Sequence, residues 1–483
     1  MNRLRKYALP ISLLLLLISV VVPISSFGYL ATLLIGMILL FNPKQGLLFL
    51  LIYFPIRPAL IEWSPSIKYV GDFIIVLLFV QALWQWVKTK PKLGKIPIFI
   101  IGFLAFCLVG TVSALITGVS IIAVIFQLRA FLITFLLILI ISIQKINKRD
   151  LYAFLWTTVI MAVMMSLQGI VEKVSLRTLL IPETWSSMQL PETNRIRIYG
   201  LIGNPNVFAT YLAIAFICSI YLKKVYTNYR LLLTIFSFLI FGVFLLTYSR
   251  GTFIAMIVGF IVYIALSKEW RVIKPVALSI ILSLPIIYFP VVGLTEYMEQ
   301  QQRMAQQPET VVEDVEVEPI KEQGDFKKRM TEAFDQNTIQ ASTEWGRIYI
   351  VKKGIEVFKD HPIIGTGFGT FGDSASLSYP SPILEEYQIP SGIYSDNQYI
   401  QVITQTGILG VISFAIFIIG MIVLLWKKRK QVGGSILFIS ILVGASAAGL
   451  LYNIWEDKTF TLYFYIFLGY TLNKSLMEKE RLN

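Results

Sequence analysis

The strongest constraint on this chain is the recurrence, from one end to the other, of long apolar runs that are almost free of charge. Only 15% of its 483 residues are charged, whereas soluble domains carry roughly 25%. A helix needs about 20 apolar residues to cross the hydrocarbon core of a bilayer. The sequence therefore predicts an all-α integral membrane protein that is embedded along its whole length.

Fourteen segments are candidate transmembrane spans: 8–27, 29–41, 46–56, 70–87, 96–117, 119–143, 151–171, 206–222, 231–248, 252–267, 272–292, 398–426, 433–451 and 459–473. The second and third are short and could be re-entrant or merge with their neighbours, so we expect about 12–14 transmembrane helices. The first run follows Arg3, Arg5 and Lys6, as in a signal peptide. Because no small-residue cleavage site comes after it, we expect this helix to be retained.

The basic residues alternate from loop to loop. Of the 42 Lys and Arg residues, 24 lie in the termini and short loops of one side, and only eight lie in the short loops of the other side. Short loops rich in Lys and Arg remain in the cytoplasm, so both termini are predicted to be cytoplasmic. The net charge of +13 is then a topology signal, with contacts to anionic membrane lipids as a by-product, and it does not indicate nucleic-acid binding.

This orientation divides the chain into three regions. Residues 1–292 form a transmembrane bundle with an outer loop at 172–205, residues 293–397 form one large extracytoplasmic loop, and residues 398–483 form C-terminal transmembrane helices. Within the large loop, 299–325 is rich in Gln and Glu and lacks aromatic residues, which predicts a solvated, partly disordered spacer. Residues 343–360 predict an amphipathic helix on the membrane or on the bundle, with apolar positions at Trp345, Ile348, Val351, Ile355 and Phe358.

Three arginines are candidates for function, one inside a span and two on the predicted outer side. Arg129 lies about ten residues into its span, where a charge suggests function, unless the helix starts later and the side chain extends to the interface. Arg197 opens the segment R-I-Y-G-L-I-G-N-P-N, and Arg250 lies in the tight turn Y-S-R-G. The planar guanidinium group suits phosphate, so these arginines are candidates for binding a lipid diphosphate, with contact to lipid headgroups as the alternative.

The end of the large loop contains a second group of candidates. The segment H-P-I-I-G-T-G-F-G-T-F-G begins at His361 and predicts a close-packed loop, because its glycines lie among apolar residues. The G-T-G-F-G segment follows no predicted strand and precedes no clear helix, so it is not a dinucleotide-binding fingerprint. The only histidine of the chain is His361, for which a structural role and proton transfer both remain open. Asp396 and Asn397 precede a span, where they could cap the helix, face a site, or do both.

Several kinds of chemistry lack the residues that they need. The chain has no Ser-His-Asp set, no H-E-x-x-H motif and no carboxylates with metal-ligand spacing. Cys107 and Cys218 lie alone in apolar runs, which is typical of small buried side chains. We therefore expect neither a metal nor a cofactor.

The order of these motifs resembles the O-antigen ligase and polymerase superfamily. The resemblance rests on R-x-x-G-x-x-G-N-P-N at 197–206, S-R-G at 249–251, Arg347, D-H-P-I-I-G-T-G-F-G at 360–369 and D-N-x-Y followed by G-x-x-G at 396–410. It implies a multi-pass plasma-membrane enzyme of surface-polysaccharide assembly whose catalytic face is extracytoplasmic. The substrate implied is a glycan on undecaprenyl diphosphate, and the reaction is a metal-independent glycosyl transfer. Other polysaccharide-assembly proteins are conceivable partners.

The resemblance also implies residue roles. Arg197 and Arg250 would stabilise the diphosphate leaving group, and Asp396 would act as a base or contact a sugar. Ligase members usually have a histidine at the position of Asp396, so this departure favours a polymerase. The candidates for substrate binding are Arg347, Arg129, Asn204, Asn206, Asn397, His361, Gly365, Gly367 and Gly369.

Two alternatives stay open. One is a ligase that transfers finished glycan to another acceptor. The other is a flippase or polysaccharide exporter, which should place charge in several spans and is often built from inverted repeats. The spans here are nearly uncharged, and no internal repeat is evident, so the sequence favours an enzyme.

Overall fold

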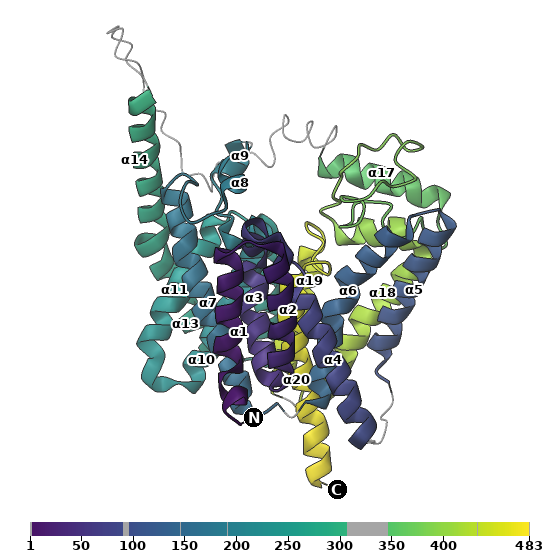
Figure 1. Ribbon diagram of the computed structural model, residues 1–483, viewed down its shortest axis with the longest axis horizontal. Helices are drawn as coiled ribbons and strands as arrows, with labels where there is room; N and C mark the ends of the chain where they lie inside the picture. The colour runs from purple at the N-terminus through teal and green to yellow at the C-terminus, as the bar shows by residue number, and fades with distance from the viewer. Residues whose placement is uncertain are drawn as a thin grey trace. The chain divides into compact units, whose positions relative to one another are not determined.

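The computed structural model describes residues 2–89, 96–144, 146–190, 192–306, 346–431 and 433–482. Every regular element within these ranges is a helix (Figure 1). Ten helical segments are long and apolar enough to cross a membrane, and three shorter apolar helices lie at Tyr7–Val21, Ser25–Leu40 and Ser435–Ala448. The chain is therefore a multi-pass, all-helical membrane protein, as predicted, whereas the orientation of its termini stays a prediction.

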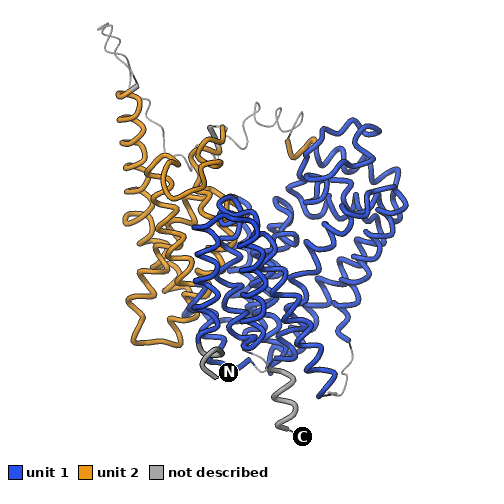
Figure 2. Tube along the Cα trace, viewed as in Figure 1, with its two compact units in different colours: residues 1–158, 250–272, 350–483 blue, residues 159–249, 273–349 orange. Residues whose placement is uncertain are grey.

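The helices belong to two compact units, which Figure 2 shows in different colours. Unit 1 comprises residues 1–158, 250–272 and 350–483, and unit 2 comprises residues 159–249 and 273–349. Helix α7 (Lys148–Val174) passes from the first unit into the second.

Unit 1 contains most of the N-terminal and C-terminal helices. In this unit, α5 packs against α18, α6 against both α4 and α20, and α12 against α19. Its helices are α1 (Asn2–Val21), α2 (Ser25–Leu40), α3 (Pro43–Trp63), α4 (Val70–Thr89), α5 (Ile98–Ile116), α6 (Ile121–Ile143), α12 (Arg250–Ser267), α18 (Gln398–Lys428), α19 (Ser435–Ala448) and α20 (Lys458–Leu482).

Unit 2 is built around the pairs α10 with α11 and α11 with α13. Its elements after α7 are α8 (Glu183–Ser186), α9 (Glu192–Arg195), α10 (Pro205–Val225), α11 (Arg230–Leu246), α13 (Ile273–Ser283), the π-helical segment η5 (Leu284–Tyr288) and α14 (Phe289–Gln306). Helix α17 (Arg347–Asp360) begins at the end of this unit and continues into unit 1.

Two predicted spans are longer than the sequence suggested. The predicted segments 29–41 and 46–56 are the helices α2 and α3, separated by a turn at Asn42, whose side chain accepts a hydrogen bond from the Gln45 amide at 3.4 Å. Helix α3 continues through Pro55 and Pro58 to Trp63. Proline usually kinks or ends a helix, but α3 retains both prolines.

A predicted span boundary lies inside a helix. Helix α14 continues to Gln306, beyond the predicted boundary at residue 292, so residues 299–306 of the predicted spacer are helical. The rest of that spacer, 307–325, and Trp345 lie outside the described residues. Within the predicted amphipathic segment 343–360, the structure has α17, with Ile350, Gly354 and Val357 buried.

Candidate functional site

In unit 2, the Asn206 side chain contacts both the segment that begins at Arg197 and the segment that begins at Ser249. Asn204 caps α10 by accepting hydrogen bonds from the amides of Asn206 and Val207 at 2.9 and 3.2 Å. The side-chain oxygen of Asn206 accepts a hydrogen bond from Arg197 Nη2 at 2.7 Å and another from Ser249 Oγ at 3.0 Å. The R-I-Y-G-L-I-G-N-P-N and S-R-G segments therefore meet at Asn206.

The Arg197 guanidinium group is oriented by a second contact. Its Nε donates to the Thr247 carbonyl at 2.8 Å, and the Ile198 amide donates to the Leu246 carbonyl at 3.2 Å. Because two nitrogens of one planar group have protein acceptors, the direction of the guanidinium is set by the fold.

A buried carboxylate at the end of α7 holds the segment that carries Arg197. Glu172 accepts hydrogen bonds from the amides of Tyr199 and Gly200 at 3.3 and 2.7 Å and forms an ion pair with Arg177 at 2.7 Å. Lys173 donates to the Ile196 carbonyl at 2.5 Å. Sequence reasoning missed this support, although a Glu-Lys pair directly after an apolar span was a signal.

The other predicted arginines open helices. Arg250 is the first residue of α12, and Arg347 is the first residue of α17. Arg250 is half-buried and Arg347 is exposed. Their predicted roles in binding diphosphate or glycan stay predictions.

At the start of α18, Asn397 caps the helix and the candidate carboxylate Asp396 does not. Asn397 is the cap, because its side-chain oxygen accepts from the amides of Tyr399 and Ile400 at 3.1 Å, while its Nδ2 donates to the Leu450 carbonyl at 3.1 Å. Asp396 precedes the cap, is half-buried and has φ +45°. A positive φ is uncommon for a residue other than glycine and costs about 1–3 kcal/mol, so the surrounding structure holds Asp396 in place.

The glycine-rich segment is wedged between two helices of unit 1. The Phe368 amide donates to the Gly110 carbonyl of α5 at 3.0 Å, and the Gly367 amide donates to the Gln405 carbonyl of α18 at 2.7 Å. Helix α18 has a non-helical residue, Gly407 at φ +56°, where it meets this segment. The predicted close-packed loop is thus present, and the backbones of α5 and α18 touch it directly.

The predicted loop residues therefore have packing roles in the structure. A Cβ on Gly365 would lie 2.4 Å from the backbone of Gln405, and a Cβ on Gly369 would contact Val119 at 3.2 Å. His361 directly follows the last residue of α17, and its amide donates to the Val357 carbonyl at 3.1 Å. Contact of these residues with substrate stays a prediction.

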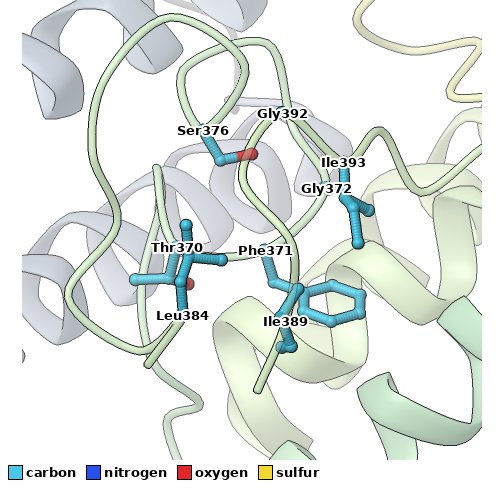
Figure 3. Close-up of a pocket in the computed structure, with 8 residues that line it drawn as sticks. All are labelled: Thr370, Phe371, Gly372, Ser376, Leu384, Ile389, Gly392 and Ile393. Carbon is cyan, nitrogen blue, oxygen red and sulfur yellow. The ribbon is translucent and has the colours of Figure 1, made fainter. Parts of the chain in front are cut away.

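The loop between α17 and α18 encloses a small pocket (Figure 3). It has room for about one water molecule, so it does not accommodate a sugar. It is lined by Thr370, Phe371, Gly372, Ser376, Leu384, Ile389, Gly392 and Ile393.

Two buried carboxylates tie this loop to the helices of unit 1. Glu456 accepts hydrogen bonds from Gln127 Nε2 at 2.6 Å, from the side chain of Gln401, and from the Ser374 amide and hydroxyl at 3.0 and 2.7 Å. Asp373 accepts from the Gly369 amide and from Gln405 Nε2, both at 2.7 Å. Each carboxylate thus crosslinks segments that are far apart in the chain.

Burial sets the protonation of this pair. Burial raises the pKa of Glu456 to about 7, with a further rise from the neighbouring Asp373 carboxylate, while its hydrogen bonds act in the opposite direction. Burial also raises the pKa of Asp373. Sequence reasoning missed both residues, although glutamines inside apolar spans, such as Gln127 and Gln401, were a signal that polar partners lie nearby.

Arg129 lies in a cluster of charged side chains in unit 1. It forms an ion pair with Asp72, and Lys458 Nζ lies 3.2 Å from the same carboxylate. Arg57 donates from Nε and Nη2 to the Lys68 carbonyl at 3.3 and 3.1 Å. Helix α6 begins at Ile121, two residues later than predicted, so Arg129 lies about two turns inside the helix. Its predicted role in binding stays a prediction.

A metal centre has no evident ligand set in the part of the chain that the structure describes. No group of three or more His, Cys, Asp or Glu side chains is placed to hold an ion there. Asp373 and Glu456 already receive hydrogen bonds from amide and hydroxyl donors, which is a poor arrangement for a cation ligand.

Fold and site define a multi-pass helical membrane protein with polar centres at helix ends. A family model described as O-antigen ligase matches residues 235–415, a stretch that contains Arg250, Arg347, His361 and Asp396. This match supports the O-antigen ligase superfamily, whose members are glycosyltransferase-like membrane enzymes of polysaccharide assembly. Arg129 and Arg197 lie before the matched stretch. No curated protein matches the chain.

Proposed function

We propose that this protein polymerises oligosaccharide repeats carried by a polyprenyl diphosphate into a cell-envelope polysaccharide at the extracytoplasmic face of the membrane. The observation that carries the proposal is the junction at Asn206, where the Arg197 guanidinium is oriented by Asn206 and the Thr247 carbonyl, and where Ser249 of the S-R-G segment bonds Asn206. An oriented guanidinium suits the stabilisation of negative charge that develops on a leaving diphosphate. The O-antigen ligase match supports the same class of reaction.

In the proposed reaction, a hydroxyl oxygen of the acceptor glycan forms a bond to the anomeric carbon of the donor. The bond from that carbon to the diphosphate oxygen breaks, and the lipid diphosphate leaves with the electron pair. Arg197 and Arg250 stabilise this charge, with Arg347 and Arg129 as binding residues. The hydroxyl proton passes to Asp396, which acts as a general base.

Polymerisation rather than ligation is favoured by Asp396, which replaces the histidine that ligases usually have. An aspartate carboxylate is ordinarily a weaker base than a histidine imidazole, so we expect this site to depend more on its leaving group. The high Lys and Ile content and the overall pattern of the sequence resemble the polymerase of teichuronic acid synthesis in Bacillus. We propose a teichuronic acid-like product on that basis.

The test uses the purified full-length chain in lipid with a polyprenyl-diphosphate-linked repeat unit, and mass spectrometry of the glycans formed. We expect longer glycans with the unmodified chain and strongly reduced elongation with Arg250→Ala and Asp396→Asn. Arg271→Gln, in a loop predicted to be cytoplasmic, is the matched control and should elongate normally. Movement of the lipid between leaflets without elongation would contradict the proposal and favour a flippase, and transfer of a finished chain to another acceptor would favour a ligase.

A further inference from the structure

Unit 1 has its own centre of positive charge, distinct in sequence from the residues around Arg197. We define the cation cluster as Arg57, Arg129 and Lys458 around Asp72. Arg129 and Lys458 form ion pairs with Asp72, and Lys458 also interacts electrostatically with Arg129 and Arg57. Among the described residues, Asp72 is the only carboxylate that forms an ion pair with Arg129 or Lys458, and Arg57 bonds the Lys68 carbonyl. One carboxylate therefore faces three cations, and the cation cluster holds an excess of positive charge.

The cation cluster has a hydrogen-bond donor that the protein does not use. Nη2 of Arg129 is enclosed and has no hydrogen-bond partner in the described ranges. An enclosed donor without an acceptor is costly, and a charged acceptor compensates best. An anion bound at this position would satisfy Arg129 and balance the excess charge.

Aromatic rings lie next to the cation cluster. The Arg129 guanidinium carbon lies 5.4 Å from the ring centre of Tyr69 and 5.9 Å from that of Phe126, and Phe126 lies 5.5 Å from Tyr379, edge to face. Tyr69 is 52% exposed. The exposed tyrosine ring and the half-buried rings beyond it lie next to cations, an arrangement that suits a ligand in which an apolar sugar face adjoins a phosphate group.

The cation cluster also lies where a membrane lipid would present its headgroup. Lys458 opens α20, Asp72 lies in the first turn of α4, and Arg57 lies about two turns before the end of α3. A short connection joins the end of α3 to the start of α4, so these positions lie at the ends of spans where hydrocarbon gives way to headgroups.

The proposed polymerisation uses two lipid-linked glycans, a donor and an acceptor, and both carry a diphosphate. We propose that the cation cluster and the row of Tyr69, Phe126 and Tyr379 bind the diphosphate and adjoining sugar of the acceptor. This inference rests on the proposed function for the identity of the ligand. The donor diphosphate then belongs to Arg197 and Arg250.

The binding test does not need turnover. The full-length chain in phosphatidylcholine nanodiscs is titrated with geranylgeranyl diphosphate, and both the number of sites and their affinities are measured. The unmodified chain should bind two molecules. Arg57→Gln should weaken one of the two sites about tenfold and leave the Asp72 ion pairs intact, because Arg57 bonds a carbonyl rather than Asp72. Adding Lys458→Gln should abolish that site.

The matched control is Lys44→Gln, which removes an ion pair with Asp150 elsewhere in unit 1 and should keep both sites. Arg197→Lys should weaken only the other site. Two unaltered sites in the Arg57→Gln chain, or a single site in the unmodified chain that Arg197→Lys removes, would overturn the inference. If Arg57→Gln weakens one binding site but the unmodified chain does not elongate glycans, the result would count against the proposed function and not against the binding site.

Two further arms identify the ligand. Phosphatidylglycerol should not displace the probe from the cation cluster, and displacement would show a general phospholipid site in place of a glycan site. A geranylgeranyl diphosphate that carries one N-acetylglucosamine should bind more tightly than the bare probe, and Tyr379→Leu should remove that difference. Equal affinities in the unmodified chain would contradict a role of the aromatic row in sugar binding.

Discussion

The wedged glycine segment allows a sharp prediction about stability. Gly367 has φ +95°, and a Cβ at this position would lie 2.0 Å from the backbone nitrogen of Ala114 and 2.1 Å from its Cα. These atoms belong to the backbone of the last turn of α5, so they cannot move aside as the tip of a flexible side chain does. Gly367→Ala should therefore separate the segment from α5.

The expected loss in the free energy of unfolding has two contributions, backbone strain and overpacking. A residue with a Cβ in the left-handed region costs about 1–2 kcal/mol, and overpacking against a rigid neighbour costs about 1–3 kcal/mol. Together they predict a loss of about 2–5 kcal/mol. The matched control is Gly392→Ala in the same loop, where φ is +76° but no atom lies within 4 Å of the added Cβ. In that variant, only the backbone strain of about 1–2 kcal/mol should lower the free energy of unfolding.

The assay is thermal unfolding of the purified chain in detergent. At roughly 2 °C for each kcal/mol in a large domain, the midpoint should fall by about 4–10 °C for Gly367→Ala and by about 2–4 °C for Gly392→Ala. Equal shifts for the two variants would refute the reasoning, because they would show that the segment is not held against the α5 backbone.

Four other outcomes follow from the structure. Asn206→Ala should reduce elongation about as much as Arg197→Lys, and the double variant should be no worse than either single variant, as a measured coupling between them would show. Burial and Asp373 raise the pKa of Glu456 from 4.5 to about 7, so the folded state holds this proton more tightly. The free energy of unfolding should then fall by about 3 kcal/mol as the pH rises from about 4.5 to about 7, and a steady or rising unfolding midpoint would contradict this. Elongation should survive a metal chelator, and its loss would reveal a metal requirement. In intact cells, an impermeant thiol reagent should label Gln301→Cys and not Lys428→Cys, and the reverse pattern would invert the predicted topology.

The helical class of the protein was predictable because each span carries its own signal. Apolar length identifies a membrane helix without reference to any other part of the chain. The boundaries were less predictable, since α3 retains Pro55 and Pro58 inside a helix. Likewise, α14 continues past the apolar run into a polar sequence.

Contacts in the candidate site were predictable only where the two interacting residues are close in the sequence. Asn204 and Asn397 cap helices over two or three residues, and such local roles can be read from residue type. The pairing of Gln127 with Glu456 joins residues 329 positions apart, and Lys458 meets Asp72 from 386 positions away. No local pattern encodes such contacts, so these side chains looked like ordinary span or loop residues.

The ion pair between Arg129 and Asp72 has a consequence for how the chain is made. An arginine about two turns inside a hydrophobic helix adds a free-energy cost to insertion from the translocon, and α6 must carry Arg129 into the membrane. Asp72 lies in α4, which is synthesised first and packs against α6, so the counter-charge is already present when Arg129 leaves the ribosome. Lys458 is synthesised after both of these residues. Asp72→Asn should therefore lower the amount of protein that reaches the membrane, a defect of biogenesis that would appear before any substrate is bound.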